Sequence, residues 1–199
     1  MKVLIVYLIL GLCLFSSCFF TSKKGFTIYR EDISLVNSIL LIQGVYCDNS
    51  GSCFFLYQNG LVKNAYVKDT IKDGYYRKNT KYDKDVFLSG SIFTIEYDLT
   101  QKELWGTYSV NNDSTIIIQT FTNCADCSLK RMVDEKKGKI LNDSTLLLNP
   151  TFSYYDKKFY TDENVAVYKF VETKIKPDST RAWFLKKHWY KKNLHPSRK

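Results

Sequence analysis

The sequence predicts an all-β protein: an antiparallel up-and-down meander of about eight short strands, closed into a barrel, with a short N-terminal helix and a C-terminal helix. Three observations predict this fold. Aromatic residues make up 16% of the chain, and they favour strands. Short apolar runs alternate with turn residues, without the helical crossovers that parallel strands require. At 199 residues, with 45% apolar residues, the chain suits one domain with its own core.

The first half of the chain predicts a helix, three strands and a long loop. Asn59-Gly60 lies between two apolar runs, and it is a strong hairpin signal because a type I′ turn needs positive φ. Residues 68–89 are polar and rich in Lys and Asp, which predicts a loop around a short strand at 75–76. The other expected elements are a helix over residues 32–40 and strands over 41–47, 53–58 and 61–67.

The second half repeats one pattern. VNNDSTIII at 110–118 and LNDSTLLL at 141–148 both run from a strand through Asn-Asp into Ser-Thr and an aliphatic run. Asn and Asp side chains bond to their own backbone in turns, so the two copies predict two hairpins of one meander. Residues 123–137 read as a loop. The expected strands are 91–97, 103–110, 115–122, 138–141, 145–148, 152–160 and 164–172.

The N-terminus has the pattern of an export signal. Residues 3–12 carry no charge and are too few to span a bilayer comfortably, and Ser16 and Ser17 precede Cys18. This stretch resembles the lipobox of bacterial lipoproteins, which implies that Cys18 becomes the acylated first residue. An ordinary signal peptide and a transmembrane anchor are the alternatives. The expected organisation is a signal peptide (1–17), a lipidated tether (18–30), a barrel domain with its C-terminal helix (31–192) and a basic tail (193–199).

The net positive charge of the chain agrees with a location in the cell envelope. The chain has 29 basic and 20 acidic residues; without residues 1–17 it loses Lys2 and no acid, which leaves 28 against 20, a net charge of +8. This excess is spread along the chain and suits an anionic membrane surface. We therefore expect a cell-envelope protein, anchored by palmitate or similar acyl chains in the outer membrane, with no nucleic-acid partner.

The cysteines also fit export. Cys47 and Cys53 stand at the two ends of a five-residue turn, where opposed hairpin residues lie close enough for a bridge. We expect a Cys47–Cys53 disulfide bond and, by default, a second bond between Cys124 and Cys127. A zinc site is the less favoured alternative, because one pair alone has the usual close spacing. A redox pair at Cys124 is also disfavoured, since no βαβ pattern surrounds it.

A wider resemblance rests on the order of the elements. An N-terminal helix, a Gly-x-aromatic pattern in the first strand (Gly44-Val45-Tyr46), successive hairpins and a final helix resemble a lipocalin-like lipoprotein of the Bacteroidota type. The resemblance covers roughly residues 30–192. It implies a barrel whose interior binds a small hydrophobic or amphiphilic ligand, without a cofactor or metal. A two-sheet sandwich of the same strands remains the alternative.

A second resemblance concerns the Asp-Ser-Thr tripeptide. Bacteroidota O-glycosylate exported proteins at Asp followed by Ser or Thr and then an apolar residue or Thr. Turn chemistry is the alternative reading of the same residues. The candidate O-glycosylation sites are Thr70, Ser114, Ser144 and Ser179.

The C-terminal segment is basic and aromatic. We expect a helix capped by Asp178 or Ser179, with Ala182, Leu185 and Trp189 on one face and Phe184 pointing away from it. Such a helix either packs on the outside of the barrel or contacts the membrane surface. The candidate membrane contacts are Trp183, Lys187, Trp189 and Lys191.

Nothing in the sequence indicates catalysis. The two histidines, His188 and His195, lie in the basic segment without a nucleophile or acid at a telling spacing. We expect a non-enzymatic protein: either a membrane-anchored barrel that binds a small ligand, or an envelope structural module with a filled barrel or sandwich that contacts another envelope protein.

Overall fold

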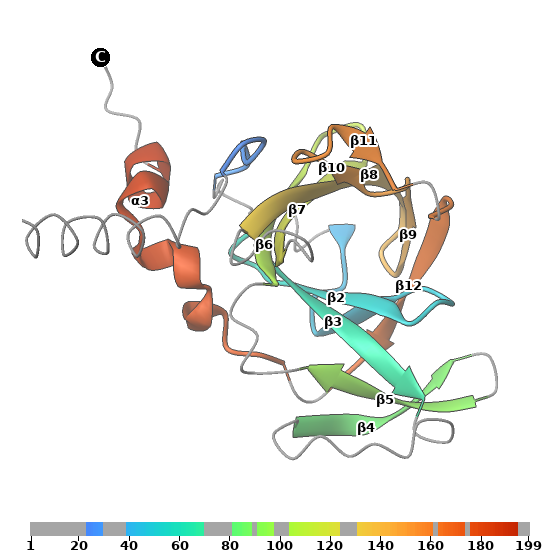
Figure 1. The fold of residues 1–199 in the computed structure, drawn as a ribbon. Helices are drawn as coiled ribbons and strands as arrows, with labels where there is room; N and C mark the ends of the chain where they lie inside the picture. The colour runs from blue at the N-terminus through green and yellow to red at the C-terminus, as the bar shows by residue number, and fades with distance from the viewer. Residues whose placement is uncertain are drawn as a thin grey trace, which may run out of the picture.

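The described chain forms one antiparallel sheet that closes on itself (Figure 1). The structure, a computed structural model, describes residues 23–29, 39–69, 81–88, 91–97, 104–123, 131–160, 163–173 and 176–194. Eight strands follow one another around a barrel, and the last pairs with the first, Gly44 opposite Glu172. They are β1 (Gly44–Cys47), β2 (Ser52–Leu56), β3 (Leu61–Asp69), β6 (Trp105–Val110), β7 (Thr115–Asn123), β8 (Arg131–Asn142), β9 (Thr145–Leu148) and β12 (Ala166–Glu172).

The order of the barrel strands is the order of the chain, which confirms the predicted meander and decides against a sandwich. Two hairpins are added to it. The hairpin of β4 (Lys81–Leu88) and β5 (Ser91–Tyr97) extends β3, and the hairpin of β10 (Phe152–Ser153) and β11 (Lys158–Phe159) extends β8.

Three of the predicted segments are wrong in part. The expected loop over 68–89 contains β4, whose polar sequence gave no strand signal although its backbone pairs with β5. The expected loop over 123–137 contains the first half of β8. Both sides of the barrel wall are covered there, so Met132 to Glu135 are all buried and the polar–apolar alternation of a half-exposed strand is lost. The single strand over 152–160 is instead a hairpin, which turns at Lys157 with a φ of 56°.

The predicted hairpin at Asn59-Gly60 is present, but its turn differs. The backbone amide of Tyr57 donates to Leu61 O, and that of Gly60 donates to Tyr57 O, both over 2.9 Å. Gly60 has a φ of 75°, whereas Asn59 is not in the left-handed region. A type I turn followed by a glycine bulge therefore replaces the expected type I′ turn.

The repeated tripeptide is turn chemistry at all three places. Asp113 Oδ1 accepts from the amide of Thr115 (3.0 Å) in the β6–β7 turn. In the β8–β9 turn Asn142 takes the same role, and accepts from the amide of Ser144 (3.0 Å). The third copy caps a 3-10 turn instead of a hairpin, because Asp178 Oδ1 accepts from the amide of Thr180 (2.9 Å). The two predicted hairpins and the predicted cap are confirmed.

Alternate residues of each strand face the two sides of the wall and form two cores. The outer core lies between the wall and the terminal segments. The inner core fills part of the barrel and consists of Leu40, Tyr46, Phe54, Leu56, Val62, Tyr108, Ile116, Ile118, Ile140, Leu146, Leu148 and Tyr168. The outer core includes Phe26, Val45, Phe55, Tyr57, Trp105, Phe121, Phe184 and Tyr190.

The C-terminal segment lies on the outside of the barrel, as one of the two expected arrangements required (Figure 1). It is not one helix. Two 3-10 turns, η2 (Ser179–Arg181) and η3 (Trp183–Lys186), precede α3 (His188–Leu194). Extended backbone at Ala182 (ψ 109°) and Lys187 (ψ 135°) separates these pieces. The prediction that Phe184 points away is therefore wrong: its side chain is fully buried in the outer core, 5.7 Å from the ring of Phe121.

The N-terminal segment 23–29 is fixed to the same outer face through Gln119, a buried residue of β7. The Gln119 side chain accepts from the amides of Thr27 (2.8 Å) and Ile28 (3.1 Å) and donates to Gly25 O (2.9 Å). Gly25 has a φ of 88°, and a Cβ there would lie 2.0 Å from the ring of Tyr154. A glycine is thus required where the segment meets the barrel.

Several predictions lie outside the described residues. These are the signal peptide (1–17), Cys18, most of the expected N-terminal helix (32–38), Thr70, the residues Cys124 and Cys127, and His195. The domain boundaries proposed from the sequence stay predictions.

Candidate functional site: the polar end of the barrel

The inward-facing residues change from apolar to polar along the barrel. On β7 the order is Ile116, Ile118 and then Thr120, with Thr122 beyond it. The neighbouring strand β8 runs from Ile140 at the apolar end to Asp134 at the polar end, and Thr120 lies opposite Asp134 in the register. Since the strands are antiparallel and continuous, the polar residues of neighbouring strands collect at one end of the barrel.

Asp134 is the central acid of this end and is 6% exposed. Its Oδ2 accepts from Thr122 Oγ1 (2.9 Å) and from the Tyr160 hydroxyl (3.3 Å). Burial raises the pKa of the Asp134 carboxyl to about 6; the carboxylates of Glu163 and Asp156 add to the rise, and the two hydroxyl donors oppose it. Burial also raises the pKa of Tyr160, to about 12, so this phenol stays a donor at neutral pH.

Glu163 forms the second acidic position. Its Oε2 accepts from the Thr151 amide (2.7 Å), from the Thr151 hydroxyl and from Lys136 Nζ (3.1 Å). Burial opposes the charged form, but these hydrogen bonds and the Lys136 charge outweigh it and hold the pKa of Glu163 below its usual value. Burial likewise opposes the charge of Lys136, yet the nearby Tyr168 and Glu163 raise its pKa. The pair is therefore ionised at neutral pH.

Two cavities meet at this ion pair. One, of about 280 Å³, lies inside the barrel between the hydroxyl-bearing residues and the rings and side chains of the inner core. The other, of about 490 Å³, lies beside the β1–β2 turn and the start of β12. Ser52, Lys136 and Glu163 line both, so the ion pair stands between them. The inner cavity is lined by Ser52, Phe54, Asn64, Ile118, Thr120, Thr122, Asp134, Lys136, Thr151, Tyr160 and Glu163.

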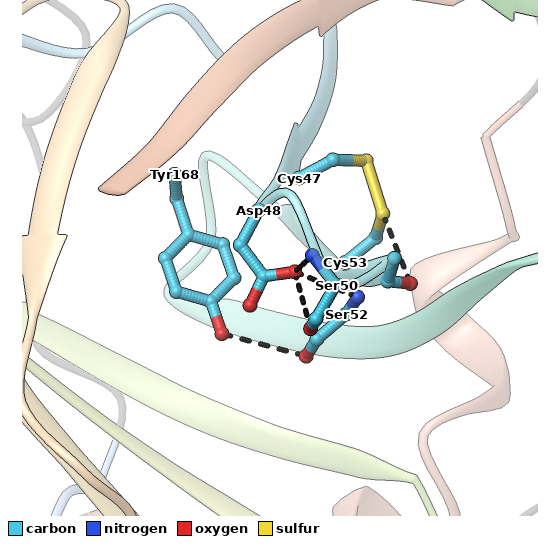
Figure 2. The surroundings of a disulfide bond; sticks show 7 residues. Cys47, Asp48, Ser50, Ser52, Cys53 and Tyr168 are labelled. Atoms are coloured by element: carbon cyan, nitrogen blue, oxygen red, sulfur yellow. Dashed lines mark hydrogen bonds between the residues drawn. A yellow bond between two sulfur atoms is a disulfide. The ribbon is translucent and has the colours of Figure 1, made fainter. Parts of the chain in front are cut away.

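The β1–β2 turn at the outer cavity is held by a disulfide bond. Cys47 and Cys53 face each other in the β1–β2 register and are bonded, which confirms the predicted pair. Figure 2 shows Asp48 inside this turn, where its Oδ1 accepts from the amides of Ser50 and Ser52, both over 2.9 Å. The Tyr168 hydroxyl donates a hydrogen bond to Ser52 Oγ over 3.4 Å, which joins the turn to β12 (Figure 2).

The opposite end of the barrel is packed. Lys176 donates to the carbonyl oxygens of Ile42 and Leu56 and lies 4.3 Å from the centre of the Tyr57 ring. Burial lowers the pKa of Lys176 to about 8. The Tyr57 hydroxyl in turn donates to Pro177 O over 2.6 Å. This end is thus covered by the segment that follows β12.

No protein-family model, no curated protein and no solved structure matches the chain. Within the described ranges, no group of three or more His, Cys, Asp and Glu residues is arranged to hold a metal ion. In the same residues, no helix has the length and apolar character needed to cross a membrane.

The sequence-predicted site residues lie away from the barrel end. Ser114 is exposed in the β6–β7 turn, whereas Ser144 and Ser179 are partly buried. Trp183 and Trp189 are partly buried against the outer core, and Lys187 and Lys191 are exposed beside them. Sequence reasoning missed the polar end entirely, because its acids and lysine lie in segments read as loop or as a single strand. Its main residues are Thr122, Asp134, Lys136, Tyr160 and Glu163.

Proposed function

We propose that the chain is a lipid-anchored, extracytoplasmic β-barrel protein that binds a small amphiphilic molecule at the polar end of its barrel. The proposal of ligand binding rests on the inner cavity of about 280 Å³, which combines hydrogen-bonding side chains with the apolar surfaces of Phe54 and Ile118. A few polar groups over an apolar lining are the usual composition of a small-molecule site. The role is one of binding and not of catalysis.

The charges at this end indicate which polar group the ligand carries. Asp134, Glu163 and Asp48 line the two cavities together with one lysine, Lys136, so acid exceeds base there in a chain with a net charge of +9. A ligand with an ammonium group and hydroxyl groups would compensate this excess and meet the threonine and tyrosine hydroxyls. We propose such a cationic amphiphile, with its short apolar part against Phe54.

Export and anchoring are supported by two independent features. The residues before Cys18 fit an acylated signal, and the Cys47–Cys53 bond is of the kind that persists in oxidising compartments. Labelling of cells with an alkynyl fatty acid tests the anchor. The full-length protein should take up the label and its Cys18→Ala variant should not; an unlabelled protein would exclude acylation.

Native mass spectrometry of the protein from its own host tests the ligand. We expect a small molecule that leaves the protein when Asp134 is changed to Asn, and that stays when the exposed Asp113 is changed to Asn. A native mass equal to chain plus lipid would contradict ligand binding. The same measurement tests O-glycosylation at Thr70, Ser114, Ser144 and Ser179, because each glycan adds mass that survives denaturation.

The second candidate is the non-enzymatic envelope module. It is favoured by the packed half of the interior, where Tyr46, Leu56 and Leu146 are fully buried. In that case the polar end would contact another envelope protein instead of a small molecule. Cross-linking in the native envelope, combined with the absence of any co-purifying molecule, would support it.

A further inference from the structure

The two ends of the described chain meet on one outer face of the barrel. We call this surface, formed by residues 23–29 and 179–194, the terminal face. Lys23 Nζ lies 5.0 Å from the centre of the Trp189 ring. The ring of Phe26 lies 5.8 Å from that of Trp189 and 6.3 Å from that of Tyr190. The N-terminal segment and α3 thus form one continuous surface.

The terminal face is basic. Neither of its two segments contains an acidic residue. Its exposed lysines are Lys23, Lys24, Lys186, Lys187, Lys191 and Lys192. The partly buried rings of Trp183 and Trp189 lie among these lysines and are fixed by the outer core beneath them. Lysines around indole rings are the combination that suits the headgroup region of a membrane.

The proposed anchor at Cys18 is close in sequence to this face, which places the face near the bilayer. The step from Cys18 to Lys23 is five residues, which span at most about 17 Å when fully extended. Because Lys23 is fixed to the barrel through the Gln119 contacts of its neighbours, the part of the terminal face around Lys23 and Trp189 lies within reach of an acylated Cys18. This step rests on the proposed anchor.

We propose that the terminal face docks on anionic lipid headgroups and thereby fixes the orientation of the barrel on its membrane. The lysines pair with lipid phosphates, and the indole rings lie at the level of the headgroups. Docking adds an electrostatic attachment to the acyl chains and holds the barrel on one side.

Vesicle flotation tests this docking without the lipid anchor. The mature chain from residue 18, with Cys18→Ser, is mixed with vesicles of phosphatidylcholine, with or without phosphatidylglycerol. We expect binding to the anionic vesicles, weakened by salt, and little binding to phosphatidylcholine alone. The variant with four Lys→Gln changes at the terminal face should bind roughly 100- to 1000-fold more weakly, since each lysine near the surface contributes about three- to fivefold. These changes are at Lys24, Lys187, Lys191 and Lys192.

A matched variant removes the same charge from exposed lysines elsewhere on the barrel and its hairpins. It should bind less than about tenfold more weakly, because none of its lysines belongs to the terminal face. Equal loss in both variants would show that net charge alone attracts the protein, and would overturn the proposal. Absence of binding to the anionic vesicles, or equal binding to phosphatidylcholine, would overturn it as well. The matched changes are at Lys139, Lys157, Lys158 and Lys169.

The outcome is separate from that of the proposed anchor. Acylation is measured in cells by the fatty-acid label at Cys18, whereas docking is measured with a chain that carries serine there. Urea unfolding of both four-lysine variants checks that each is folded, and all of the changed side chains are exposed.

Discussion

Changing Asp134 to Asn is expected to stabilise the protein at neutral pH. The carboxyl has a pKa of about 6 in the folded protein, raised by burial from 3.8, and is 6% exposed. Between pH 4 and 6 the folded protein holds a proton at Asp134 that the unfolded chain releases, so the contribution of this residue to the stability of the wild type falls as the pH rises. Above pH 6, this difference in pKa between the folded and unfolded states lowers the free energy of unfolding by about 3 kcal/mol at most. Asn is neutral and can still accept from Thr122, so we expect it to recover about 1–3 kcal/mol.

Urea unfolding of wild type and variant at several values between pH 4 and pH 7.5 measures this effect. The titration of all the other acids cancels when the unfolding free energies of the two proteins are subtracted at each pH. The variant should be more stable at pH 7.5, and its advantage should disappear near pH 4. The control is Asp113→Asn, which removes an exposed charge whose pKa is lowered by hydrogen bonds from Thr115 and so should give no gain at neutral pH. A variant that is less stable than wild type at pH 7.5, or an advantage that does not change with pH, would refute the reasoning.

Three further changes test the fold. Gly25→Ala should destabilise the protein by about 2 kcal/mol and release the N-terminal segment, because the added Cβ meets the Tyr154 ring at a positive φ; urea unfolding and proteolysis near residue 25 would show both effects. Changing Cys47 and Cys53 together to Ser should lower the unfolding free energy by about 2 kcal/mol in the chain-entropy model; wild type under reducing conditions should lose the same amount. Phe184→Ala should cost about 3–5 kcal/mol as a fully buried ring, against less than about 1 kcal/mol if the residue were exposed as the sequence suggested; thermal or urea unfolding decides between these values.

The barrel was predictable because its turns are local. Asn59-Gly60 and the two Asn-Asp turns are each determined by a few neighbouring residues, and the strands between them follow. The C-terminal helix was predicted as continuous since helical periodicity is also local. The extended backbone at Ala182 and Lys187 turns Phe184 against a barrel wall about 60 residues away in sequence, which periodicity cannot show.

The candidate site was not predictable for a related reason. Asp134 and Lys136 lie in the part of β8 where both faces of the wall are covered, so the strand signal was lost. Thr122 and Asp134 meet when β7 pairs with β8, and Tyr160 reaches them only after the β10–β11 hairpin has folded back onto β8. A periodicity of two, followed through residues 131–137, would have placed Asp134 and Lys136 on the same inner face as Ile140.

Two adjacent carboxylates on β8, those of Asp134 and Glu135, have different roles in this barrel. Glu135 faces the outer wall, where it accepts from Gln119 (2.6 Å) and Tyr154 (2.9 Å) and pairs with Lys137 (3.2 Å). Its interactions hold the N-terminal segment on the barrel, so they are explained by the fold. Asp134 faces the inner cavity, and it takes part in neither of the ion pairs found among the described residues.

A buried acid that opposes folding at neutral pH is not explained by stability, because an apolar or neutral side chain of similar size would serve the fold better. Such a residue is expected where a ligand supplies the missing charge. If a cationic ligand binds at Asp134, its presence should lower the pKa of that carboxyl and remove the stability difference between wild type and Asp134→Asn. The pH series described above, repeated with the molecule that co-purifies with the protein, therefore tests the acid and the ligand together.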